Sequence, residues 1–210
     1  MDMSLPQVAV VLAGGQSRRM QGEDKALALI GGERMIDRVV RRLSRQVGQV
    51  LLSAPHDYGT GLEAIADLPE GPAGPVGAIR AAALHLAARD VHAFVTAPVD
   101  APFVPDDLVE RLAASAPVAM AADDGGGGSP GAWQPAFALW DARAVIAALP
   151  AEVCAEKWSL RRLGEALGAR AVEFPEPGAL MNVNTPRELA MAQALAGDVA
   201  GDAPGGPGTA

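Results

Sequence analysis

The 210-residue chain contains a single cysteine, Cys154, and aromatic residues make up only 4% of it. One cysteine cannot form an intramolecular disulfide, and it cannot supply a thiolate zinc cluster. We expect Cys154 to be a small buried apolar residue rather than a reactive one. The three histidines have no spacing typical of a metal site, and no Gly-x-Ser-x-Gly motif marks a nucleophilic serine. These absences favour chemistry that depends on positioning and charge neutralisation, such as phosphoryl or nucleotidyl transfer.

Basic residues are also in deficit, with 17 lysines and arginines against 25 acidic residues and a net charge of −8. A general nucleic-acid binder needs a broad cationic surface, so this balance argues against that class. No uninterrupted apolar run approaches the about 20 residues of a membrane span. The first six residues lack the basic and apolar regions of a signal peptide. We therefore expect a cytoplasmic protein that binds neither nucleic acid nor membranes.

Strand and helix signals alternate along the chain. Residues 8–12 and 93–96 have the β-branched, apolar character of buried strands, and helical spacing follows in residues 36–47 and 76–88. Such alternation predicts an α/β protein with a mostly parallel central sheet and helices on both faces. We expect one domain over residues 1–196. The Gly-, Pro- and Ala-rich stretch 197–210 is predicted to be a disordered tail.

The first strand leads into LAGGQSRRMQGEDKA, residues 12–26, which joins two adjacent glycines to three cations, Arg18, Arg19 and Lys25. Glycine-rich backbone beside fixed cations at the carboxyl end of a strand suits a polyphosphate. The spacing matches neither a Walker loop nor a dinucleotide fingerprint. The alternative interpretation is a solvated surface loop that is basic by chance.

Asp100 ends another apolar strand and is followed by Ala-Pro. An aspartate in this position can hold Mg²⁺, which favours carboxylate, water and phosphate oxygens. The nearby Pro102 and Pro105 also allow a purely structural role as a helix cap or turn residue. Ligands of open α/β sheets bind beyond the carboxyl ends of the strands, so Asp100 and the opening loop are expected to share one crevice.

Four motifs together carry a resemblance that extends from about residue 8 to residue 193. LAGGQSRRMQGEDKAL, GPVGAI, TAPVDAPFVPDDL and MNVNTPREL occur in the order and approximate spacing of the molybdenum cofactor guanylyltransferase family. The resemblance implies a three-layer, Rossmann-like nucleotidyltransferase fold. It also implies Mg²⁺-dependent transfer of GMP from GTP to the terminal phosphate of molybdenum-loaded molybdopterin, with release of pyrophosphate. Transient contacts with proteins that deliver and receive the cofactor are implied as well.

Family roles are carried over motif by motif. The implied nucleotide-binding residues are Leu12, Ala13, Gly14, Gly15, Lys25, Ser53, Asp67 and Asp100. The implied catalytic residues are Lys25, Asp100 and Arg19, with Asp100 as the Mg²⁺ ligand. Asn182 and Asn184 are expected near the acceptor phosphate and pterin. Ser53 stands where the family often has asparagine.

Other functions remain open at this point: a molybdopterin cytidylyltransferase, a sugar-1-phosphate nucleotidyltransferase, or a nucleotide-binding regulatory protein without turnover. The opening Leu-Ala-Gly-Gly and the later Asn-Val-Asn-Thr-Pro resemble the guanylyl branch rather than the cytidylyl branch. The presence of both Lys25 and Asp100 argues for an enzyme over a regulator.

Overall fold

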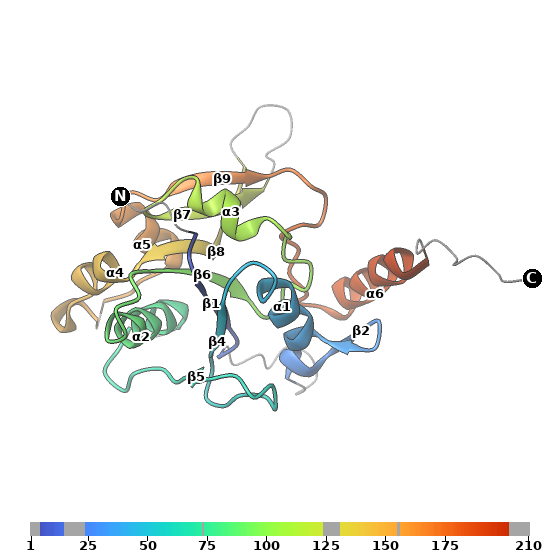
Figure 1. Ribbon diagram of the computed structural model, residues 1–210, viewed down its shortest axis with the longest axis horizontal. Helices are drawn as coiled ribbons and strands as arrows, with labels where there is room; N and C mark the ends of the chain where they lie inside the picture. The colour runs from blue at the N-terminus through green and yellow to red at the C-terminus, as the bar shows by residue number, and fades with distance from the viewer. Residues whose placement is uncertain (1–4, 15–23, 73, 124–130, 155, 202–210) are drawn as a thin grey trace, which may run out of the picture.

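The computed structural model describes residues 5–14, 24–72, 74–123, 131–154 and 156–201, with side chains described up to residue 197. A seven-stranded sheet with the order β5-β4-β1-β6-β8-β7-β9 forms its centre (Figure 1). The strands are β1 (Val8–Leu12), β4 (Gln49–Ser53), β5 (Ala64–Ile65), β6 (Ala93–Pro98), β7 (Ala119–Asp123), β8 (Trp133–Asp141) and β9 (Arg170–Phe174).

The sheet is parallel except at β8, which runs antiparallel to both of its neighbours, β6 and β7. Strand β1 pairs in parallel with β4 and β6, β4 pairs in parallel with β5, and β7 pairs in parallel with β9. The prediction of a mostly parallel sheet is therefore confirmed. The carboxyl ends of β4, β1 and β6 consequently meet at one edge of the sheet, where a ligand crevice is expected.

Helices cover both faces of this sheet. They are α1 (Met35–Leu43), α2 (Pro75–Ala87), α3 (Leu108–Ala113), α4 (Ala142–Ala148), α5 (Leu160–Ala166) and α6 (Pro186–Gly201), with short 3-10 turns η1 (Lys25–Leu27) and η2 (Ala151–Val153). Along β1, Ala9 and Val11 pack towards α1 and α3, whereas Val10 packs towards α2, α4 and α5. Side chains of a strand alternate between faces, so this division produces two cores and the predicted three layers.

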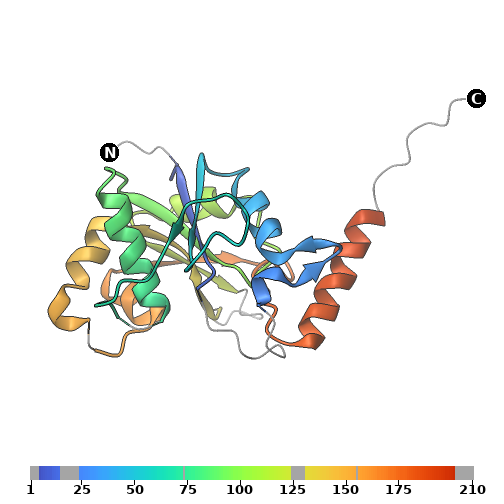
Figure 2. The same ribbon diagram turned by 90° about the horizontal axis from the view of Figure 1, so that it is seen from below.

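A smaller unit lies beside the main sheet. The hairpin of β2 (Leu29–Ile30) and β3 (Glu33–Arg34) packs against α6, and in Figure 2 both lie at the opposite end of the molecule from α2 and α4. Its core joins Ile30 and Met35 to Val183, Ala192 and Ala196. The sequence analysis predicted neither this hairpin nor α4.

A capping box forms the start of α6. Thr185 Oγ1 accepts a hydrogen bond from the Glu188 N–H at 3.2 Å, and Glu188 Oε2 accepts from the Thr185 N–H at 2.8 Å. The end of α6 corrects a prediction, because the helix continues to Gly201 and the expected disorder from Gly197 is wrong for residues 197–201. Alanine-rich sequence has high helix propensity and tolerates a single glycine. Residues 202–210 lie outside the described residues.

Two further expectations concern composition. Cys154 is buried, with 8% of its surface exposed, as expected for a small apolar residue. Within the described residues, every helix is too short or too polar to span a bilayer.

A hydrogen bond inside the sheet provides a test of the fold. Trp140 Nε1 on β8 donates to Thr96 Oγ1 on β6 at 3.0 Å, and both side chains are fully buried. Thr96→Val keeps the shape but leaves the indole N–H without an acceptor, which should lower the free energy of unfolding by about 1–3 kcal/mol. Urea unfolding measures this loss. The loss should shrink in a Trp140→Phe background, and an equal loss in both backgrounds would contradict the assignment.

Candidate active site

A buried lysine lies at the centre of the site. Asp24 caps η1, its Oδ1 accepting from the Ala26 N–H at 3.0 Å, and this turn directs Lys25 inward, where only 6% of the residue is exposed. Lys25 Nζ donates to Asn184 Oδ1 at 2.6 Å and lies 3.6 Å from Asp100 Oδ2. Three predicted site residues from distant motifs thus meet at one ammonium group.

Asp100 lies in the turn after β6. Its backbone carbonyl accepts from the Val183 N–H at 2.7 Å, and a quarter of its side chain is exposed. Helix α3 begins only at Leu108, so Asp100 does not cap it. Burial raises the pKa of the Asp100 carboxyl above its usual value, and the Lys25 ammonium opposes that rise. The Lys25 ammonium thus favours the ionised form of Asp100, which burial disfavours.

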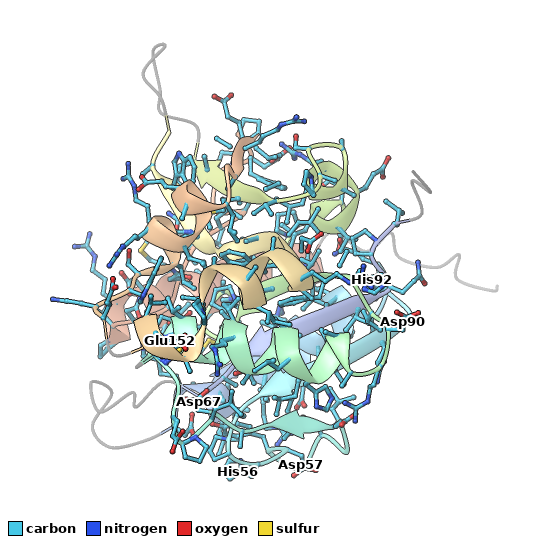
Figure 3. The ribbon with its side chains drawn as sticks, turned by 90° about the vertical axis from the view of Figure 1, so that its left-hand side faces the viewer. His56, Asp57, Asp67, Asp90, His92 and Glu152 are labelled. Carbon is cyan, nitrogen blue, oxygen red and sulfur yellow. The ribbon has the colours of Figure 1, made fainter. Side chains whose placement is uncertain are left out.

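A cavity of about 590 Å³ opens at the carboxyl ends of β1, β4 and β6, and we call it the strand-end cavity. It is lined by all the predicted nucleotide-binding residues that the structure describes: Leu12, Ala13, Gly14, Lys25, Ser53, Asp67 and Asp100. Asp67 lies past the end of β5, on the connection to α2 (Figure 3). Gly15, Arg18 and Arg19 fall outside the described residues, so the structure does not test their predicted roles.

Close backbone packing fixes the wall of this cavity. The Ala13 N–H donates to the Ser53 carbonyl at 2.9 Å, and the Val99 N–H donates to the Leu12 carbonyl at 3.1 Å. A Cβ on Gly14 would lie 3.4 Å from the Ser53 carbonyl oxygen, at the border between tight and ordinary contact. The backbone at Gly14 thus runs close to the end of β4.

Tyr58, which the sequence analysis missed, braces the same wall. Its hydroxyl donates to the Ala13 carbonyl at 3.0 Å. Burial raises the pKa of Tyr58 to about 12, and the nearby Asp24 carboxylate adds to this shift, so the hydroxyl remains a donor at neutral pH. It is the only tyrosine in the chain and precedes a Gly-Thr-Gly turn, a signal that could have identified it.

The loop around Tyr58 is itself tightly held. Tyr58 has a φ of +54°, a left-handed conformation that is uncommon for a bulky residue. Its carbonyl accepts from Arg34 Nη1 at 2.8 Å, and Arg34 is paired with Asp37. The preceding Asp57 accepts from two glycine N–H groups of the turn. These contacts hold the backbone of Tyr58 in a conformation that it would rarely adopt by itself.

A second cavity, of about 730 Å³, lies beside the ends of β7, β8 and β9, and we call it the β7–β9 cavity. Asn182, Asn184 and Glu188 line it, together with Asp123, Gln134 and the segment 174–181. The Asn182 Oδ1 atom is buried and has no hydrogen-bond partner among the described residues. Asn184 belongs to this cavity and also binds Lys25, so the two cavities adjoin at Lys25.

The donor set fits a magnesium–phosphate site better than a protein-only metal centre. Within the described residues, no three His, Cys, Asp or Glu side chains cluster in a way that could hold a metal. Figure 3 shows two of the histidines, His56 and His92, on separate parts of the surface. Of the described carboxylates that line the strand-end cavity, Asp24, Asp67 and Asp100, it is Asp100 that forms an ion pair with Lys25. Mg²⁺ commonly takes one or two carboxylates and completes its shell with phosphate oxygens and water.

Comparison with known proteins agrees with this arrangement. The family model described as MobA-like NTP transferase domain matches residues 9–170. A molybdenum cofactor guanylyltransferase of Cereibacter sphaeroides (strain ATCC 17029 / ATH 2.4.9) is 38% identical over 190 residues, covering 89% of this chain and 95% of the relative. The protein of the same name from Rhodobacter capsulatus is 40% identical over 191 residues, covering 88% of this chain and 93% of the relative.

Solved structures show the same fold at low sequence identity. Molybdopterin-guanine dinucleotide biosynthesis protein A from Archaeoglobus fulgidus superposes with a TM-score of 0.62 at 22% identity, covering 91% of this chain and 99% of that one. A CMP:2-keto-3-deoxy-manno-octonic acid synthetase gives 0.68 at 16% identity, covering 91% and 98%. The predicted nucleotidyltransferase fold is confirmed, and the chain belongs to the MobA-like NTP transferase family.

Proposed function

We propose that this protein transfers GMP from GTP to molybdenum-loaded molybdopterin and releases pyrophosphate. An oxygen of the acceptor's terminal phosphate attacks the α-phosphorus of GTP, and the bond from that phosphorus to the bridging oxygen of the β-phosphate breaks. The observation that carries the proposal is Lys25, held by Asp100 and Asn184 where two cavities meet. The names of the relatives in Cereibacter and Rhodobacter support it.

Each charged group at this junction has a role in that transfer. The Lys25 ammonium would bind phosphoryl oxygens and offset the negative charge that gathers on them in the transition state. The Asp100 carboxylate would hold Mg²⁺, which when bound supplies further neutralisation of the phosphates. Arg19, which the structure does not describe, stays a predicted catalytic residue.

The wall of the strand-end cavity suits the guanine base. Guanine presents two donors, its N1–H and 2-amino groups, that backbone carbonyls such as that of Ala13 could accept. Gly14 lines the cavity and has no side chain that a purine would have to avoid. Ser53 is buried beside them, and its hydroxyl would take the place of the usual asparagine amide. Asn182 and Asn184 would bind the acceptor from the β7–β9 cavity.

Two finer points stay predictions from the sequence. These are a cytoplasmic location and transient contacts with proteins that deliver the acceptor and receive the product.

Asp100→Asn should lower kcat by at least about 100-fold, because losing a group that stabilises transition-state charge has effects of that size. The same change should leave the protein folded, because the asparagine amide still offers an oxygen to Lys25, which also keeps its bond to Asn184. Burial raises the pKa of Asp100 in the folded protein above its value in the unfolded chain. The contribution of this carboxyl to the free energy of unfolding therefore falls as the pH rises from the unfolded to the folded pKa, and neutral asparagine does not undergo that loss. Pyrophosphate release and thermal melting measure the two effects. Asp106→Asn, at an exposed position beyond the same strand, is the control. A folded Asp100→Asn protein with near-normal Mg²⁺-dependent turnover would refute the metal assignment.

Tyr58→Phe should raise the KM for GTP roughly 5-fold, the equivalent of one lost hydrogen bond of about 1 kcal/mol. The ring and its packing remain, so the KM for the acceptor should not change. Steady-state kinetics with each substrate varied in turn separates the two values. An unaltered KM for GTP would show that the Tyr58–Ala13 contact is structural only.

The base preference tests the whole proposal. In a competition between equal GTP and CTP for molybdopterin, we expect guanine dinucleotide to predominate strongly, because a site built on hydrogen bonds to one base can discriminate by about 10⁴-fold. Mass spectrometry of the product identifies the base. Predominant cytosine dinucleotide would indicate a molybdopterin cytidylyltransferase. Turnover only with a sugar phosphate would indicate a sugar-1-phosphate nucleotidyltransferase, and nucleotide binding without turnover would indicate a regulatory protein.

A further inference from the structure

Two polar side chains of the β7–β9 cavity have no role in the reaction described so far. Gln134 Nε2 lies 3.0 Å from both Oδ1 and Oδ2 of Asp123. Both side chains are partly exposed and line the cavity with Asn182 and Asn184. A single amide nitrogen therefore spans the front of a carboxylate that could accept two separate donors.

The register of β7 and β8 places Asp123 and Gln134 on the same face of the sheet. In the β7–β8 ladder Ala121 lies opposite Gln134, so Asp123, two residues further on, projects from the same face as Gln134. The register shifts between Met120 and Ala121, where β8 carries extra residues that include Pro135. Bulges of this kind re-aim side chains and often lie next to active sites.

Once Gln134 Nε2 turns aside from the carboxylate that it now covers, the pair offers a row of two acceptors and one donor. The Asp123 carboxylate supplies the acceptors, and the Gln134 amide nitrogen supplies the donor. The pyrimidine edge of a pterin offers the complementary row, which is the 2-amino group, the N3–H and the O4 carbonyl. Charge-assisted, paired hydrogen bonds of this type are strong and geometrically specific.

We propose that Asp123 and Gln134 recognise the pterin edge of the acceptor, an inference that rests on the proposed function. Asp123 accepts from the 2-amino and N3–H groups, and Gln134 Nε2 moves from the front of the carboxylate to donate to O4. The acceptor then extends along the cavity past Asn182, whose Oδ1 is unpartnered among the described residues, to Asn184 and Lys25. At about 730 Å³ the cavity has the size of a small-molecule site.

Guanine carries the same donor–donor–acceptor row, so the experiment must tell the two ligands apart. The probes are free pterin and lumazine, which differ because lumazine has an oxo group in place of the 2-amino group. Their intrinsic fluorescence allows titration of the wild-type protein without turnover. We expect pterin to bind at least about 10-fold more tightly, because the lumazine oxygen would face the Asp123 carboxylate.

Asp123→Asn should abolish or reverse this preference, since an amide offers one acceptor and one donor. A purely structural role would not change the ratio of the two affinities. The matched control is Glu176→Gln in the same cavity, whose carboxylate is already paired with Arg111 at 3.0 Å, and it should keep the wild-type ratio. Thermal melting confirms that both variants fold.

Kinetics with both substrates completes the test. In Asp123→Asn the KM for molybdopterin should rise at least about 10-fold while the KM for GTP stays constant. A rise in the KM for GTP instead would mean that the pair binds guanine, and would overturn the proposal. Equal binding of pterin and lumazine to the wild type, or no saturable pterin binding, would also overturn it. Wild-type protein that prefers pterin over lumazine but forms no guanine dinucleotide would refute only the proposed function.

Discussion

The burial of the Lys25 ammonium is the constraint on which the rest of the site depends. A buried charge is costly unless it is paired and hydrogen-bonded, so Lys25 requires oxygen partners. Asp100, from the end of β6, and Asn184, from the segment before α6, supply them. The Asp100 carbonyl also accepts from the Val183 N–H, which ties the same two segments together through the backbone. One side chain thus joins the two halves of the site.

The antiparallel strand β8 contributes its amino-terminal end to the same edge of the sheet at which the parallel strands end. Strands β4, β1 and β6 run in parallel and end together at the strand-end cavity. Because β8 runs the other way, its amino-terminal end, with Gln134, reaches the same edge of the sheet as the carboxyl ends of β7 and β9. A single edge therefore carries both cavities, which we propose bind the nucleotide and the acceptor, with Lys25 between them.

Much of this arrangement could be predicted from the sequence, because short-range patterns encode it. The apolar strands, the close approach at Gly14 and the capping box at Thr185 depend on local chemistry that the residues display directly. The direction of β8 could not be predicted, since apolar alternation does not distinguish parallel from antiparallel neighbours. The contact of Tyr58 with Ala13 also escaped prediction because it joins a loop to a residue far away in the sequence. That of Asp123 with Gln134 escaped because it depends on the register between β7 and β8.

The charges of the strand-end cavity bear on the proposed roles of Mg²⁺ and of the basic residues in the glycine-rich loop. Among the described residues, Asp24, Asp67 and Asp100 line this cavity against one lysine, Lys25. A nucleoside triphosphate adds several negative charges to that surface, and Lys25 alone cannot balance them. Burial already opposes ionisation of Asp100, so more negative charge nearby would raise its pKa further unless cations accompany the nucleotide. A divalent cation on Asp100 and arginines in the loop would provide that balance, and this requirement connects the proposed Mg²⁺ site to the predicted role of Arg19.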